Sequence, residues 1–224
     1  MCYKGFASDF RSKKIFEMKV AVFDLDGTLI KWSGERRFLP WMIFRLKLSP
    51  FKFIPFLFRS LKDMSFYSSK LYYKGENIEK IERLASLFFS PESVKGMVFK
   101  DGEREIENLK KEGYKIILLT GAPYFIADKF KILGFDMIVP CYLEGRDGKF
   151  TGELISYPSG KKKKDILLNL SRELSIDLST SKGYGNSYED REFLSLLGFP
   201  VAVNPSLKLK RFAERMGWEI KYWR

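Results

Sequence analysis

The sequence predicts an α/β fold, a doubly wound and mainly parallel sheet that carries an inserted helical cap. Short β-branched and apolar runs, such as 19–23 and 115–119, alternate with amphipathic stretches of about 10 to 14 residues. This alternation is typical of parallel sheets that are covered by helices on both faces. Between residues 33 and 97 the alternation stops, and successive helical patterns rich in Phe, Leu and basic residues follow. This stretch predicts the insertion.

The expected elements follow from periodicity and from the glycines that end each run. Strands are expected at 19–23, 115–119, 136–140, 183–185, 200–203 and 218–222. Helices are expected at 104–113, 122–133, 162–174 and 206–216. Residues 145–148 (Gly-Arg-Asp-Gly) predict the turn of a hairpin. We therefore expect a catalytic core at 18–32 and 98–224, a helical cap at 33–97, and an N-terminal extension at 1–17.

The composition excludes several kinds of active site, because the 224 residues contain no histidine. A Ser-His-Asp triad, a Cys-His pair, a phosphohistidine and a His-ligated zinc site are all excluded. The two cysteines, Cys2 and Cys141, are too few for a disulfide framework or a metal cluster. Acid–base chemistry must then fall to Asp, Glu, Lys, Tyr or Cys.

Two carboxylates, Asp24 and Asp26, stand where the first predicted strand ends. Side chains two residues apart point the same way from an extended chain, and ligands of open parallel sheets bind at the carboxyl ends of the strands. Paired carboxylates without histidine favour a hard divalent cation. The alternative is a pair of acidic turn residues that cap the next helix.

Three further segments complete a pattern that resembles the haloacid dehalogenase-like (HAD) phosphatase superfamily, whose core is Rossmann-like. Its opening motif DxDGT matches residues 24–28, and Thr120 ends the predicted strand KIILL. Lys163 heads the segment KKDILLNL, and residues 185–190 (GNSYED) supply an acidic loop. The resemblance covers about residues 18–224. It is strongest to the branch that contains phosphoserine phosphatase and bacterial phosphatidylglycerophosphatase.

The resemblance implies a role for each matched residue. Asp24 is the nucleophile that becomes an aspartyl phosphate, and Asp26 is the general acid and then the general base. Thr120 and Gly121 bind phosphoryl oxygens, with backbone N–H groups after Thr120 that open a helix. Lys163 binds the phosphoryl group and offsets the negative charge on this group and on the nucleophile. The resemblance implies a Mg²⁺ cofactor, with the following candidate ligands: Asp24, Asp26 through its carbonyl, Asn186 and Asp190.

Two of these assignments depart from a simple match. Lys163 lies in a run of four lysines, 161–164, and Lys161 is the alternative. Asn186 stands where the family usually has Asp, so that ligand brings no charge. Asp190 then becomes the more important carboxylate of the loop, either as a direct ligand or by orienting a metal-bound water. A relative that binds phosphorylated ligands without turning them over remains an alternative.

The insertion concentrates the positive charge of the chain. Residues 31–74 contain ten Lys or Arg against two acids, which is +8 of a net charge of +12. Within it, residues 51–62 (FKFIPFLFRSLK) place a broad Phe and Leu face beside a narrow basic face, as in interfacial membrane helices. The alternative is that these phenylalanines fill the core of the cap. No run is long enough for a membrane span.

Substrate and partners follow from the cap. A basic, apolar cover favours an anionic phosphomonoester, and two classes stay open: a phospholipid head-group phosphate at an anionic membrane surface, or a soluble metabolite such as phosphoserine. No nucleic-acid-binding motif accompanies the charge. Because residues 1–17 lack an apolar segment of signal-peptide length, we expect a cytoplasmic protein, either soluble or peripheral on the inner membrane face. The oligomeric state stays open.

Overall fold

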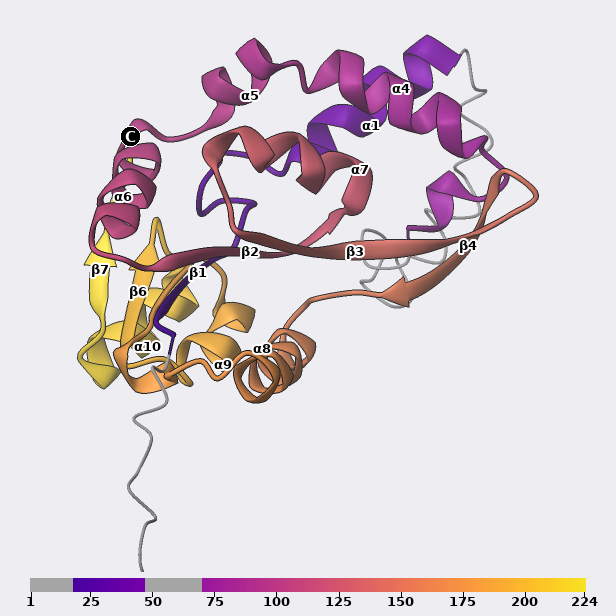
Figure 1. Cartoon of the computed structure of the whole chain (residues 1–224). Coiled ribbons are helices and arrows are strands. Elements are labelled where there is room, and N and C mark those ends of the chain that lie inside the picture. The colour runs from indigo at the N-terminus through magenta and orange to yellow at the C-terminus, as the bar shows by residue number, and fades with distance from the viewer. Residues whose placement is uncertain (1–17, 47–69) are drawn as a thin grey trace, which may run out of the picture.

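The computed structural model describes residues 18–46 and 70–224 (Figure 1). The predicted N-terminal extension at 1–17 and the amphipathic stretch at 51–62 lie outside the described residues. No helix within the described part of the chain is both long and apolar enough to traverse a bilayer.

One seven-stranded sheet forms the centre of the molecule, in the strand order β4-β3-β2-β1-β5-β6-β7. All neighbouring strands pair in parallel except β3 and β4. This confirms the predicted doubly wound α/β fold. The strands are β1 (Val20–Phe23), β2 (Lys115–Pro123), β3 (Met137–Arg146), β4 (Lys149–Ser156), β5 (Lys182–Gly185), β6 (Phe199–Val203) and β7 (Glu219–Lys221).

Helices cover both faces of the sheet, as Figure 1 shows. Successive side chains of β1 point to opposite faces of the sheet, so Phe23 belongs to one buried cluster and Val22 to another. The cluster of Phe23 includes side chains of α6 (Lys100–Lys111), α7 (Tyr124–Ala127) and the 3₁₀ helix η3 (Asp128–Leu133). The opposite face is covered by α8 (Lys161–Glu173), α9 (Arg191–Leu194) and α10 (Leu207–Met216). Short 3₁₀ turns, η4 (Leu178–Thr180) and η5 (Tyr188–Asp190), flank β5.

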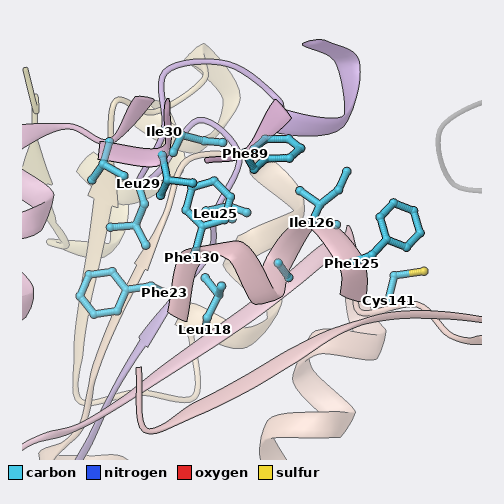
Figure 2. Close-up of a cluster of buried hydrophobic side chains, with 14 of the residues drawn as sticks. Phe23, Leu25, Leu29, Ile30, Phe89, Leu118, Phe125, Ile126, Phe130 and Cys141 are labelled. Atoms are coloured by element: carbon cyan, nitrogen blue, oxygen red, sulfur yellow. The ribbon is translucent and has the colours of Figure 1, made fainter. Parts of the chain in front are cut away.

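The predicted insertion contains α1 (Gly34–Leu46), η2 (Leu71–Tyr73), α4 (Ile78–Phe88) and α5 (Pro91–Met97). Asn77 and Ser90 cap α4 and α5 by accepting backbone N–H bonds. Phe38 of α1 packs against Phe89 and Phe125, so these helices share one hydrophobic core with the sheet. Figure 2 shows the part of that core around Phe23, Phe89 and Phe125. The limits of a separate cap, 33–97, stay a prediction.

Aromatic rings form a stack directly beneath the end of β1. The rings of Phe23 and Tyr184 lie 4.3 Å apart and nearly parallel. Trp223 lies 5.7 Å from Tyr184 and 6.5 Å from Phe23, between ring centroids. The Tyr184 hydroxyl donates to Glu105 of α6 at 2.6 Å. This stack fixes the last residue before Asp24.

Two local predictions need comment. The hairpin is confirmed, since Asp147 and Gly148 both have positive φ and join β3 to β4 as a two-residue turn. The expected helix at 122–133 was placed too early, because β2 continues through Pro123 and α7 begins only at Tyr124. The backbone after Thr120 therefore stays extended and does not open a helix there. The Ala122 N–H donates to the Thr120 hydroxyl at 3.1 Å.

Candidate active site

Asp24 follows β1 directly and lies at the centre of the candidate site. Its backbone N–H donates to the carbonyl of Tyr184 in β5, which continues the parallel pairing past Phe23. One carboxylate oxygen accepts from Lys163 Nζ at 2.6 Å, and the other accepts from Thr28 Oγ1 at 3.1 Å. Burial raises the pKa of Asp24, and although Lys163 opposes this effect, the pKa rises to about 7.

Lys163 is brought to Asp24 by the first turn of α8. Lys161 and Lys162 are exposed and Lys164 is half-buried, whereas Lys163 is 4% exposed. The structure therefore places Lys163, and not the alternative Lys161, beside Asp24. Burial lowers the pKa of Lys163, but the carboxylates of Asp190 and Asp24 more than offset this effect. The pKa lies above its ordinary value, and the lysine stays charged.

Asp190 closes the loop that follows β5. One oxygen accepts from Lys163 Nζ at 2.8 Å. The other accepts from the backbone N–H of Asn186, from the backbone N–H of Ser187 and from the Ser187 hydroxyl. Gly185 allows this close packing, because a Cβ there would lie 2.7 Å from Asp190 Cβ. Both oxygens of Asp190 thus accept protein hydrogen bonds and orient Lys163 and the loop, and direct metal ligation by Asp190 stays a prediction.

Asn186 packs against the turn that follows Asp26. Gly27 has φ +80°, and a Cβ there would lie only 2.0 Å from Asn186 Nδ2. Glycine is therefore required both by backbone conformation and by space. Asn186 Oδ1 lies 3.4 Å from Thr28 Oγ1, the hydroxyl that also donates to Asp24. The amide oxygen and a carboxylate oxygen thus flank one hydroxyl.

The Asp26 side chain is held from the start of α1. Its two oxygens accept from the Ser33 hydroxyl and from the Gly34 backbone N–H, each at 2.9 Å. Burial raises the pKa of Asp26, and these two hydrogen bonds oppose the shift. An elevated pKa suits a group that must hold a proton before it gives one to a leaving oxygen.

Thr120 and Gly121 lie in β2, next to β1. Thr120 is 1% exposed. Gly121 borders the cavity described below, where a Cβ would lie 3.1 Å from the Tyr157 ring and 3.3 Å from the Pro158 carbonyl. Phosphate binding by Thr120 and Gly121 stays a prediction.

A cavity of about 170 Å³ brings most of the predicted site residues together, but Thr120 is not among the residues that border it. It is bordered by Asp24, Asp26, Gly121, Lys163, Asn186 and Asp190, among others. A second cavity of about 410 Å³ adjoins it and is bordered by Asp26, Trp32, Ser33, Glu35, Lys70 and Tyr157, among others. The two cavities share Asp26, Gly121, Tyr157, Asn186 and Ser187, so a phosphate group in the first leaves room for its ester group in the second.

Sequence reasoning missed the residues that surround Asp26. Ser33 carries a weak signal, because a serine just before a predicted helix often makes local hydrogen bonds. Glu35 and Lys70 carry no local signal and were counted only as charges of the cap. They form a buried ion pair, in which Glu35 also accepts from the Tyr72 hydroxyl. Their pairing depends on two segments 35 residues apart in the chain.

The oxygen atoms at the candidate site are of the kind that ligates a magnesium ion. In residues 18–46 and 70–224, no three Asp, Glu, Cys or His side chains are grouped so as to hold a metal. The candidate ligands are instead the carboxylates of Asp24 and Asp190, the carbonyl of Asp26 and the amide oxygen of Asn186. Oxygen-only ligands with few full charges, completed by water and by substrate phosphate, are typical of Mg²⁺ sites.

The sequence model of the haloacid dehalogenase-like hydrolases matches residues 21–195. The chain belongs to this family. Phosphoserine phosphatase SerB1 of Mycobacterium tuberculosis is 27% identical over 219 residues, covering 91% of this chain and 70% of that protein. A histidinol-phosphatase of Neisseria meningitidis is 30% identical over 112 residues, covering 47% of this chain and 50% of the relative.

Solved structures agree with this assignment at the level of the fold. A protein of unknown function from Bordetella pertussis has a TM-score of 0.79 at 17% identity, covering 92% of this chain and 98% of that one. A phospho-aspartyl intermediate analogue of phosphoserine phosphatase has a TM-score of 0.64 at 20% identity, covering 92% and 93%. Family and relatives together make this chain a HAD phosphatase, a phosphoric monoester hydrolase.

Proposed function

We propose that this phosphatase hydrolyses a phosphomonoester in two steps through an aspartyl phosphate on Asp24, with Mg²⁺ as its cofactor. The observation that carries the proposal is the position of Asp24: its carboxylate borders a 170 Å³ cavity, 2.6 Å from the Lys163 ammonium, with Asp26 at the same cavity. Asp24, Asp26 and Asn186 would hold the ion. When bound, Mg²⁺ supplies positive charge that screens the phosphoryl oxygens from the nucleophile.

In the first step, an oxygen of Asp24 bonds to phosphorus as the phosphorus–oxygen bond to the leaving alcohol breaks. Asp26 gives its proton to that leaving oxygen. In the second step, water attacks phosphorus while Asp26 takes a proton from it, which restores Asp24 and releases inorganic phosphate. Lys163 stays charged throughout and offsets the negative charge of Asp24 and of the phosphoryl group. Thr120 and Gly121 would contact phosphoryl oxygens.

The substrate proposed is a soluble phosphorylated metabolite. Relatives named phosphoserine phosphatase and histidinol-phosphatase support this class. The lipid substrate and the anionic membrane surface were inferred chiefly from residues 51–62, which lie outside the described residues, and none of these relatives supports them. The 410 Å³ cavity beside Asp26 suits a leaving group of metabolite size.

The test is phosphate release in the presence of Mg²⁺ from a panel of phosphomonoesters. The panel contains phosphoserine, histidinol phosphate, 4-nitrophenyl phosphate and phosphatidylglycerophosphate in mixed micelles. We expect release from a soluble ester and a loss of about 10³-fold or more in Asp24→Asn, because the amide is no nucleophile. Release only from the lipid would overturn the proposed substrate class. No release from any ester would favour a phospho-ligand-binding protein without turnover.

A further inference from the structure

Among the described residues, the hydrogen-bond donors to the Asp26 carboxylate come from the start of α1. Ser33 Oγ donates to one oxygen and the Gly34 N–H donates to the other. Two donors from adjacent residues fix both the position and the plane of the carboxylate. Whatever fixes residues 33 and 34 therefore also fixes the proposed general acid.

The next residue, Glu35, is anchored inside the protein. Its side chain is 3% exposed, and its two oxygens accept from Lys70 Nζ and from Tyr72 Oη. Lys70 is 2% exposed and has φ +50°, a left-handed backbone conformation that a lysine seldom adopts. The first turn of α1 is thus tied to the segment 70–73 by a charged pair and a hydroxyl.

Stability alone gives little reason for this arrangement. A buried ion pair usually stabilises a fold no better than apolar side chains of the same volume, because both charges must lose their water. What such a pair does supply is direction, since its hydrogen bonds are satisfied in only one geometry. Glu35 and Lys70 also border the 410 Å³ cavity together with Asp26 and Ser33. The pair therefore lies at the cavity proposed for the leaving group.

The opposite side of the same turn is held by apolar packing. A Cβ at Gly34 would lie 3.4 Å from the Phe89 ring and 3.5 Å from Ile30. Residue 34 is thus enclosed between these side chains on one side, and Glu35 is held by Lys70 and Tyr72 on the other. Loss of the ion pair would remove the polar half of this support.

We propose that Glu35, Lys70 and Tyr72 are positioning residues for Asp26: they hold the first turn of α1 so that Ser33 and Gly34 aim the Asp26 carboxyl at the leaving oxygen. The inference rests on the role of Asp26 in the proposed function. It implies that the trio serves proton transfer to the leaving group and contributes little to the attack of Asp24.

Leaving groups of different basicity separate these two contributions. A 4-nitrophenolate departs without a proton, whereas an alkoxide needs one in the transition state, and such proton transfer contributes about 10²- to 10⁴-fold. For Lys70→Met we expect kcat/KM, which includes only the steps through departure of the leaving group, to fall about 10-fold more for an alkyl phosphate than for 4-nitrophenyl phosphate. The alkyl phosphate is one that the wild-type protein hydrolyses. Because Lys70→Met leaves Glu35 without its counter-ion, Glu35→Gln with Lys70→Met is measured as well, and the same selective loss is expected.

Two controls make the result specific. Asp26→Asn must show a selective loss for the alkyl ester, and if it does not, the proposed role of Asp26 fails before the inference is reached. Lys115→Met removes an ion pair with Asp136 at the start of β2, at the other end of the strands from Asp24, and should affect both esters equally. Equal losses for both esters in the folded Lys70 variants would overturn the inference. So would a raised KM for the alkyl ester with unchanged kcat, which would assign the pair to binding the leaving group.

Discussion

In the part of the chain that the structure describes, two buried clusters place a lysine against carboxylate groups, and the clusters differ in charge balance. In the catalytic cluster, Lys163 is shared by Asp24 and Asp190, so two carboxylates face one ammonium. In the positioning cluster, Glu35 is the carboxylate that pairs with Lys70 among residues 18–46 and 70–224, and a neutral tyrosine completes the hydrogen bonds of Glu35. The first cluster has a surplus negative charge, whereas the charges of the second are balanced among the described residues, and each cluster borders a cavity. The difference indicates that a surplus charge is kept where a cation or a proton must join.

The largest effect is expected when the lysine of each cluster is replaced in turn. Lys163→Met leaves Asp24 and Asp190 as buried like charges, and we expect activity on 4-nitrophenyl phosphate to fall about 10³-fold. Lys70→Met should leave kcat/KM for that ester within a few-fold of the wild-type value, because 4-nitrophenolate departs without a proton. Urea unfolding should show that each variant loses about 3 kcal/mol, because each leaves a buried carboxylate unpaired. Equal activity losses at equal stability would remove the functional distinction between the clusters.

The surplus charge also predicts a pH effect in protein freed of metal by a chelator. The pKa of Asp24 is about 7 in the folded state against an ordinary 3.8, so its contribution to stability is fully present below pH 3.8 and is lost as pH rises to about 7. The Asp24→Asn variant has no carboxyl group at this position, so it does not lose stability in this way as pH rises. The stability of the variant relative to the wild-type protein should therefore increase between pH 4 and 7, on the order of 3 kcal/mol. Thermal unfolding at each pH checks it, and a constant difference would contradict it.

The smallest expected effect concerns the cation that the catalytic cluster can admit. Asn186→Asp adds a charge beside Asp24, and we expect Mg²⁺ to bind about 10-fold more tightly, since affinity follows the number of charged ligands. Titration calorimetry without substrate measures this directly. Asn108→Asp, at an exposed position on α6, is the matched control and should leave the affinity unchanged. An unchanged affinity in Asn186→Asp would mean that residue 186 does not reach the ion.

The catalytic cluster could be predicted from sequence because topology alone brings it together. Asp24 and the loop after Gly185 follow β1 and β5, which are neighbours in the sheet, and parallel strands place their ends at one edge. Each segment also carries its own short motif. The strand alternation and the Asp147–Gly148 turn were predicted for similar reasons, since each depends on local residue types.

The positioning cluster could not be predicted because nothing local distinguishes a buried charge from a solvated one. Lys70 and Glu35 were counted among the charges of a basic surface, yet both are almost fully buried. Their pairing depends on the tertiary contact between the first turn of α1 and the residue that precedes η2, which lie 35 residues apart in the chain. The extension of β2 past Thr120 was missed for a related reason: its pairing with β3, through Pro123 and Cys141, is a tertiary contact.

The ring stack of Phe23, Tyr184 and Trp223 gives the protein an intrinsic fluorescent reporter. The indole of Trp223 is 7% exposed, so its emission is expected at short wavelength. Phe23 is the residue before Asp24, and Trp223 borders a third cavity that also touches Gly27 and Asn186. A rearrangement of the catalytic loops therefore changes the surroundings of a chromophore that is already present, and binding can be followed optically without an added label.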